Sequence, residues 1–541
     1  MGEPLADTAL GNYLAARVAR LERDTDAAAQ FYSVALDKDP TNARLVGRTM
    51  LMVLAEGEMQ RSFELAERQL AVQEADPTAR LILAVRDMRN GDWEPAREHL
   101  LKSRRAGIAT LLYPMLQAWI ETAEGDGAAA RQALESLSGQ NAFDAFRLFH
   151  SALANDILGD AKTAGAFHRQ TMAGGSRAAT RVILAYAAHL TRQGQTDEAA
   201  ELFADYLKEY PENAVIEQAA ARLSKDGIVE MPVADAVQGA AEALMGAAGA
   251  LTRDRTSQGA IIYLRLALYL RPDLDAAHML LGDVLEANGR YAASNAVYAK
   301  VPSSSPYYWD ARIRIASNLN RLDKVDDTLT LLREMAGLRD SDTTALVTAG
   351  DILRSRERYA EAVADYDRAL DRVAVLDDRH WAILYARGIA LERSQQWPRA
   401  EQDFLKALEL RPEHPLVLNY LGYSWIEKGI NIEDARKMIE RAVEQRPNDG
   451  YIVDSLGWVL YRIGRFDEAV GQLERAVELR PEDPVINDHL GDAYWRAGRH
   501  LEARFQWRHA LALGAQPEEV EKIREKLRNG LPPLSAVNSG T

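Results

Sequence analysis

The sequence predicts an all-α protein built as a solenoid of helix pairs. Three observations predict this fold class: small residues recur about every 34 residues, turn-forming glycines recur in step with them, and the composition favours helices. Alanine and leucine are abundant in the 541 residues, whereas proline occurs 19 times. Because one compact domain rarely reaches this length, we expect a repeat array or several domains.

The period is clearest in the C-terminal half. Gly388 and Gly422 lie 34 residues apart, as do Gly457 and Gly491. Glycine inside a helix costs about 1 kcal/mol relative to alanine, so we expect close approach of a partner helix at each of them. The expected partners are the small residues of the second helices, Ala400, Ala435, Ala469 and Ala503. A coiled coil is disfavoured because it would show a period of seven.

The N-terminal half keeps the period with a weaker signature. Glycines suited to a left-handed helix end recur at spacings of 34, 34, 34 and 35 residues. They are Gly57, Gly91, Gly125, Gly159 and Gly194. Extending the period along the chain predicts 14 helix pairs, anchored at Ala16, Met50, Ala84, Ala118, Ala152, Ala187, Ala248, Gly282, Ala316, Gly350, Gly388, Gly422, Gly457 and Gly491.

One break in the period predicts the domain organisation. Ala187 and Ala248 are 61 residues apart, which is neither one repeat nor two. We therefore predict an N-terminal array over residues 1–211, an irregular junction over 212–232, and a C-terminal array over 233–528 that ends in a capping helix. A disordered tail is expected over residues 529–541. The charged capping helix covers the last apolar face, so we expect a monomer or small oligomer.

Composition excludes several classes of function. The formal net charge of −15 argues against nucleic acid and against a polybasic membrane surface. The absence of cysteine excludes disulfides and thiolate catalysis. No segment is apolar enough for a transmembrane helix, and the first residues lack the features of a signal peptide.

No motif for nucleotide binding, zinc hydrolysis or serine catalysis occurs, so we expect no enzyme activity, no cofactor and no metal. His489, His500 and His509 are close in sequence but fall on different helices or a turn, which favours solvated or packed histidines. Asp488 and Asp492 share one helix face, where a solvated face is favoured over an acid pair.

The pattern of small residues and prolines from about residue 9 to residue 528 resembles the tetratricopeptide repeat family. The resemblance implies a right-handed superhelical α-solenoid whose first helices line a groove that binds proteins or peptides. Carried onto the last four pairs, the inward positions are Tyr385, Asn419, Tyr423, Tyr451, Asp454, Trp458, Tyr461, Arg462, Asp488, Asp492, Trp495 and Arg496. Such residue types are typical of binding hot spots, although packing between helices is the alternative. Some members of this family bind the C-terminal carboxylate of a partner with Lys and Asn side chains on successive first helices. Here an acidic residue, Asp454, stands at such a position, so we do not predict this mode of binding.

A closer resemblance is carried by residues 418–425, 451–458 and 487–495. These segments are similar to C-terminal repeats of long tetratricopeptide proteins of the Gram-negative envelope. Some of those are outer-membrane lipoproteins that act as adaptors for carboxyl-terminal processing proteases. The resemblance implies an adaptor that is periplasmic or outer-membrane-associated if a leader has been removed, with a cytoplasmic location as the alternative. The alternative functions are a self-assembling scaffold and, last, an enzyme.

Overall fold

The structure is a computed structural model that describes residues 8–22, 24–103, 107–139, 143–173, 179–252 and 258–532. In these ranges the chain forms 30 α-helices and one short 3-10 helix, and no strand occurs in them. The predicted all-α class is therefore confirmed. Twenty-eight of the helices form 14 consecutive pairs, the number predicted, whereas α13 (Ala214–Asp226) and α30 (Pro517–Asn529) stand outside the pairs.

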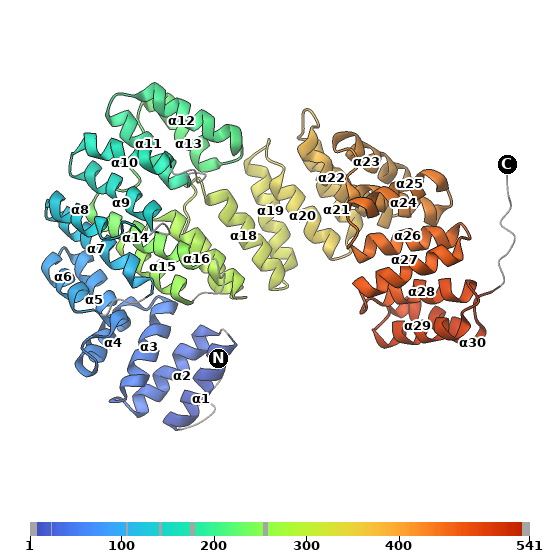
Figure 1. Cartoon of the computed structure of the whole chain (residues 1–541), viewed down its shortest axis with the longest axis horizontal. Helices are drawn as coiled ribbons and strands as arrows, with labels where there is room; N and C mark the ends of the chain where they lie inside the picture. Colours follow the sequence, from blue (N-terminus) through green and yellow to red (C-terminus); the bar gives the residue numbers. More distant parts are fainter. Residues whose placement is uncertain are drawn as a thin grey trace. The chain divides into compact units, whose positions relative to one another are not determined.

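The chain forms two compact units, Met1–Leu331 and Leu332–Thr541, and Figure 1 labels their helices. The first unit contains α1 (Ala9–Leu21), α2 (Thr25–Lys38), α3 (Ala43–Glu56), α4 (Met59–Val72), α5 (Pro77–Asn90), α6 (Trp93–Lys102), α7 (Ala109–Ala123), α8 (Gly127–Glu135), α9 (Asp144–Ile157), α10 (Ala161–Ala173), α11 (Thr180–Arg192), α12 (Thr196–Glu209), α13, α14 (Ala236–Leu251), α15 (Gln258–Leu270), α16 (Asp275–Ala287), α17 (Tyr291–Tyr298) and α18 (Tyr308–Arg321).

The division between the units falls within α19 (Val325–Leu338). The second unit continues with α20 (Thr344–Ser355), α21 (Tyr359–Leu370), η1 (Asp378–His380), α22 (Trp381–Arg393), α23 (Trp397–Leu410), α24 (Pro415–Lys428), α25 (Ile432–Gln445), α26 (Gly450–Arg462), α27 (Phe466–Leu479), α28 (Pro484–Arg496), α29 (His500–Ala512) and α30. None of the described helices combines the length and the apolar composition that a membrane span requires.

Helices begin and end where the sequence supplies caps. Asp76 precedes α5 and accepts hydrogen bonds from the backbone N–H groups of Thr78 and Ala79, which would otherwise lack helical partners. Gly91 ends α5 in the left-handed conformation, with a φ of 84°. All five predicted turn glycines have this conformation: Gly57, Gly91, Gly125, Gly159 and Gly194.

The nearest neighbours of the glycines inside the first helices are not the predicted alanines, although at Gly422 the carbonyl oxygen of Ala435 also lies 3.0 Å from the place of a Cβ atom. A Cβ atom on Gly388 would lie 2.6 Å from the ring of Phe404, and one on Gly491 would lie 2.5 Å from the ring of Trp507. The large side chain, and not the small alanine four residues before it, therefore lies nearest to the glycine. This glycine contact, in which a large side chain of the second helix fills the space of a missing Cβ, recurs at Gly282–Tyr298, Gly350–Tyr366, Gly422–Ile439 and Gly457–Leu473.

In the first unit, α14 and α15 pack against the inner wall, which we define as α3, α5, α7 and α9, the first helices of four pairs. Helix α14 contacts α7 and α9, and α15 contacts α3 and α5 (Figure 1). The ring of Trp119 on α7 lies so close to Gly239 on α14 that a Cβ atom there would be 2.4 Å away. The chain therefore covers the inner wall of its own N-terminal repeats.

Apolar burial and specific polar contacts hold α14 and α15 in this position. Leu244, Leu264 and Leu266 are fully buried, and each buried leucine contributes about 1.5–3 kcal/mol. Arg181 on α11, which is partly exposed, forms an ion pair with the buried Glu242 on α14. Arg265 on α15 donates a hydrogen bond of 3.0 Å to the carbonyl of Ala55 at the end of α3.

The predicted junction over residues 212–232 is largely helical, because α13 occupies residues 214–226 between an Asn213 cap and Gly227 in the left-handed conformation. The carbonyl of Pro232 accepts a hydrogen bond of 2.6 Å from Arg271. The compact units divide at Leu331 and not in the junction, because α14 and α15 pack back onto the N-terminal helices.

The first residues of the tail predicted over residues 529–541 are ordered. Asn529 is the last residue of α30, and Gly530 is buried against Trp495. Residues 533–541 lie outside the described residues.

Replacing Gly457 by alanine is expected to destabilise the second unit by about 1–3 kcal/mol, because the new Cβ would lie 2.5 Å from Cγ of Leu473. The matched control is Gly471→Ala in α27, where nothing lies within 4 Å of the new Cβ. That change should stabilise the helix by up to about 1 kcal/mol. Denaturant unfolding followed by circular dichroism measures both. Shifts in the same direction would contradict the glycine contact.

Candidate functional site

The second unit contains a groove formed by α22, α24, α26, α28 and α30, with a volume of about 650 Å³. Four of the predicted site residues line it: Tyr423, Trp458, Asp488 and Asp492. The other lining residues are Glu392, Arg393, Tyr420, Ser424, Glu427, Lys428, Pro484, Val485, His489, Ala515, Gln516, Glu519, Lys522, Ile523 and Lys526. We refer to this surface as the C-terminal groove.

Trp458 lies half-buried at the centre of the C-terminal groove. Its ring stacks on Tyr461 at 4.8 Å and on His489 at 4.1 Å, measured between ring centroids. Its Nε1 donates a hydrogen bond of 2.6 Å to Glu427, which also pairs with Arg462 at 3.0 Å. Trp458 therefore packs between helices and also lines the groove, and its role in binding stays a prediction.

Asp488 and Asp492 do not form the solvated helix face that the sequence favoured. Nζ of Lys526 on α30 lies 2.8 Å from a carboxylate oxygen of each, and Asp492 also accepts a hydrogen bond of 2.9 Å from Nε1 of Trp507. Asp492 is 5% exposed. Burial raises its pKa to about 6 against the opposing charge of Lys526. The reason for the difference is that α30 covers this end of the groove.

Asp454 is also engaged within the protein. Both of its carboxylate oxygens lie 3.0–3.1 Å from Nδ1 of His489, and both side chains are buried. Burial by itself would lower the pKa of His489, but the charge and hydrogen bond of Asp454 outweigh burial and raise it. This pair ties α26 to α28 below the ring of Trp458.

The remaining predicted residues lie outside the lining of the C-terminal groove. Tyr385 packs against Phe404 and Tyr420, and Trp495 packs against Trp507. Tyr451 is 52% exposed beside Arg480. The others are Asn419, Asp454, Tyr461, Arg462 and Arg496. Their roles in binding stay predictions.

Sequence reasoning missed several groove residues. Val485 is an apolar side chain that is 49% exposed directly on the groove wall. Lys522 and Lys526 lie four residues apart on α30, a spacing that places them on one helix face. Their charge opposite to that of Asp488 and Asp492 was the signal that could have placed α30 against the groove.

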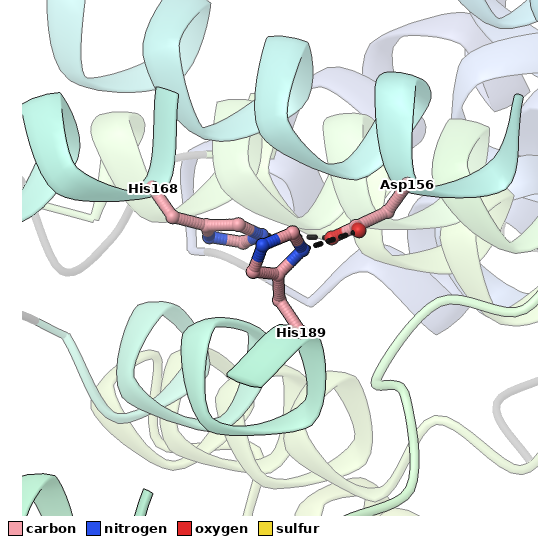
Figure 2. Close-up of side chains that lie close together, drawn as sticks. All are labelled: Asp156, His168 and His189. Carbon is pink, nitrogen blue, oxygen red and sulfur yellow. Dashed lines mark hydrogen bonds and ion pairs between the residues drawn. The ribbon is translucent and has the colours of Figure 1, made fainter. Parts of the chain in front are cut away.

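A second cluster was missed in the first unit. Asp156, His168 and His189 come from three successive helices, α9, α10 and α11, and lie close together in the core (Figure 2). His189 follows Asp156 by 33 residues, nearly one repeat. That spacing was the available signal, since equivalent positions of neighbouring repeats lie side by side.

Arrays of helix pairs with a groove along one face are typical of protein-interaction scaffolds, a class that is typically non-enzymatic. Family models identify tetratricopeptide repeats in parts of this chain. One tetratricopeptide repeat model matches residues 341–413, a second matches 385–450, 430–484 and 455–519, and a third matches 183–213. The prediction of tetratricopeptide repeats is therefore confirmed for these segments.

The TPR repeat-containing protein PA4667 of Pseudomonas aeruginosa is 25% identical over 197 residues, which are 36% of this chain and 32% of that protein. The match thus spans about a third of the length of this curated relative. A tetratricopeptide repeat protein from Parabacteroides merdae has a TM-score of 0.39 at 16% identity, covering 47% of this chain and 99% of that one. The Cut9–Hcn1 hetero-tetramer of APC/C has a TM-score of 0.39 at 14% identity, covering 96% of both chains.

The buried pair of His489 and Asp454 should make stability depend on pH. Since the folded-state pKa of His489 is raised, its contribution to stability is fully present below about pH 6.5, the unfolded value. It is lost as the pH rises through the folded value, with a slope of at most about 1.4 kcal/mol per pH unit. Urea unfolding at several pH values above 6.5 measures this. His489→Gln and Asp454→Asn should each flatten the slope, and an unchanged slope in both variants would contradict the assignment.

Proposed function

We propose that the C-terminal groove binds a segment of a partner protein and that the chain acts as an adaptor. The observation that supports this proposal most directly is Val485, an exposed apolar side chain in a concave groove beside the half-buried rings of Tyr423 and Trp458. Exposed apolar surface next to aromatic rings is typical of the anchor region of an interface. An amphipathic helix or extended segment suits such a groove.

Several charged side chains of the groove are already paired within the protein, which favours binding of an apolar side chain of the partner. Glu427 is held by Trp458 and Arg462, and Asp488 and Asp492 are held by Lys526. Breaking the pairs of Asp488 and Asp492 with Lys526 for a partner's charges would leave largely buried charges unpaired. We therefore expect apolar side chains of the partner to enter the groove while polar groups stay at its rim.

The finer proposal is that the partner system is a carboxyl-terminal processing protease of the Gram-negative envelope. It is supported by the similarity of residues 418–425, 451–458 and 487–495 to repeats of envelope adaptors. In this proposal the chain works in the periplasm or at the outer membrane and presents substrates to the protease or activates it.

Val485→Arg tests the groove. Placing a photo-crosslinking residue at position 485 identifies the partner in cells, and isothermal titration calorimetry with that purified partner then gives the affinity of each variant. We expect Val485→Arg to weaken binding about 30-fold or more, which corresponds to 2 kcal/mol or more at an anchor position.

The matched control is Leu501→Arg. Leu501 lies on α29 outside the groove lining and is 81% exposed, so both changes put arginine in place of an exposed apolar side chain of the second unit. Leu501→Arg should bind like the unchanged chain. Equal affinities for all three proteins, with folding verified by circular dichroism, would place the binding surface elsewhere.

The protease proposal has its own test. The chain should accelerate cleavage of a peptide or protein substrate by the carboxyl-terminal processing protease of the same organism, and Val485→Arg should remove most of that acceleration. If the protease neither binds the chain nor responds to it, the adaptor proposal for this enzyme class fails, while the groove result with another partner stands.

A further inference from the structure

The core of the first unit contains a cluster of two histidines and one carboxylate that the scaffold function does not use. Figure 2 shows His168 and His189 converging on Asp156 from α10 and α11. Nε2 of His168 lies 2.8 Å from Oδ2 of Asp156, and Nδ1 of His189 lies 2.7 Å from Oδ1. One potential ligand atom of each residue lies within 4.8 Å of those of the other two. All three side chains are buried.

We propose that Asp156, His168 and His189 bind a divalent transition-metal ion such as Zn²⁺, Co²⁺ or Ni²⁺. Imidazole nitrogen and carboxylate oxygen are ligands that these ions prefer, at about 2.0–2.2 Å from the metal. Three atoms as close as these can reach that distance by small side-chain movements around one centre. Two imidazoles and one carboxylate leave at least one coordination position for water or another ligand.

Other buried histidines in the described ranges lack this arrangement. His150 accepts a hydrogen bond from Trp119, His278 contacts the carbonyl of Pro272, and His489 pairs with one carboxylate. In the cluster, by contrast, two imidazoles share one carboxylate. The hydrogen bonds of the cluster also leave one buried polar atom unpaired. Nδ1 of His168 has no hydrogen-bond partner among the described residues.

The imidazole nitrogens nearest to the carboxylate of Asp156 each form a hydrogen bond with it. Metal binding would displace the protons that the imidazoles now share with the carboxylate.

Gly165 on α10 preserves room for the ring of His189. A Cβ atom at this position would lie 2.9 Å from Nε2 of His189. Glycine inside a helix is unfavourable relative to alanine, so its presence here is consistent with a need to admit the imidazole between α10 and α11.

Arg192 is the one cation in direct contact with the cluster among the described residues. Its Nη2 lies 2.5 Å from Oδ1 of Asp156, and its side chain is 40% exposed. The guanidinium would repel a divalent ion at this distance, but its exposure lets it turn outward to solvent. Arg192 therefore lies between the cluster and solvent. If the cluster is a metal site, removing the charge of Arg192 should strengthen metal binding. If the three side chains serve only for packing, no metal binding should appear.

The experiment uses the full chain without a polyhistidine tag, treated with EDTA and then exchanged into chelator-free buffer. Titration with Co²⁺ is followed by visible ligand-field absorption, and Zn²⁺ binding is measured by equilibrium dialysis with elemental analysis. We expect one ion per chain and a higher melting temperature in the presence of Zn²⁺, because a ligand that binds only the folded state stabilises it.

His168→Gln and His189→Gln should each lower the affinity by more than the ~10–100-fold that loss of an outer-shell partner costs. The matched control is His489→Gln, which alters a buried histidine with one carboxylate partner and should leave the ion bound. Arg192→Met should raise the affinity at least about tenfold, since it removes the repelling charge.

Two results would overturn the proposal. The first is a folded, unchanged chain that shows no Co²⁺ absorption and no stoichiometric Zn²⁺. The second is ion binding that survives in His168→Gln and His189→Gln, which would assign it to exposed side chains. The first result is measured on the unchanged chain, so the proposal can still be tested if a variant fails to fold.

Discussion

The packing of α14 and α15 against the inner wall of the N-terminal pairs is the constraint on which the organisation of the first unit depends. Two apolar helices that would otherwise expose Leu244 and Leu264 find cover there, and α3, α5, α7 and α9 gain a partner for the faces that a repeat array leaves open. The ring of Trp119 against Gly239 and the ion pair between Arg181 and Glu242 allow one register for this contact. Because a removed partner would leave a buried charge, the polar pair penalises other arrangements. The inner wall of the first unit is thus committed to the chain itself.

Unlike the inner wall of the first unit, the C-terminal groove keeps exposed apolar surface. Its helices are held together by Trp458, His489 and Asp454 beneath the surface, and α30 closes one end through Lys526. The aromatic rings and the paired charges therefore mainly hold in place the helices that form the groove. What is left for a partner is the exposed apolar surface around Val485 and the outer parts of Tyr423 and Trp458. A groove with preformed, internally paired walls loses little conformational entropy on binding, which favours specific recognition of a fitting segment.

The period of 34 residues was enough to predict the all-α class, the 14 helix pairs and the turn glycines, because these depend on contacts between neighbours in sequence. The sequence could not show that Phe404 and not Ala400 fills the space at Gly388, since both lie on the same face of α23. Nor could it show why the period breaks: α14 and α15 meet helices that end at least 79 residues earlier in the chain, and such contacts leave no local signature. The twelve predicted groove residues were chosen by their position in the repeat. Four of them line the groove. Lys526 was missed because α30 follows the last repeat, and Val485 was missed although it occupies the same place in its repeat as the predicted Tyr451. The cluster at Asp156 was missed because its residues lie on three helices.

Hydrogen exchange measured by mass spectrometry, on the free chain and on its complex with the partner captured at position 485, tests the central claim most directly. If the inner wall of the first unit is filled by the chain itself, amides of α14 and α15 should exchange as slowly as those of α7 in the free chain and should not change on binding. Protection should appear instead in α24, α26 and α28 around the C-terminal groove. Fast exchange in α14 and α15 of the free chain, or protection of the inner wall by the partner, would contradict this account.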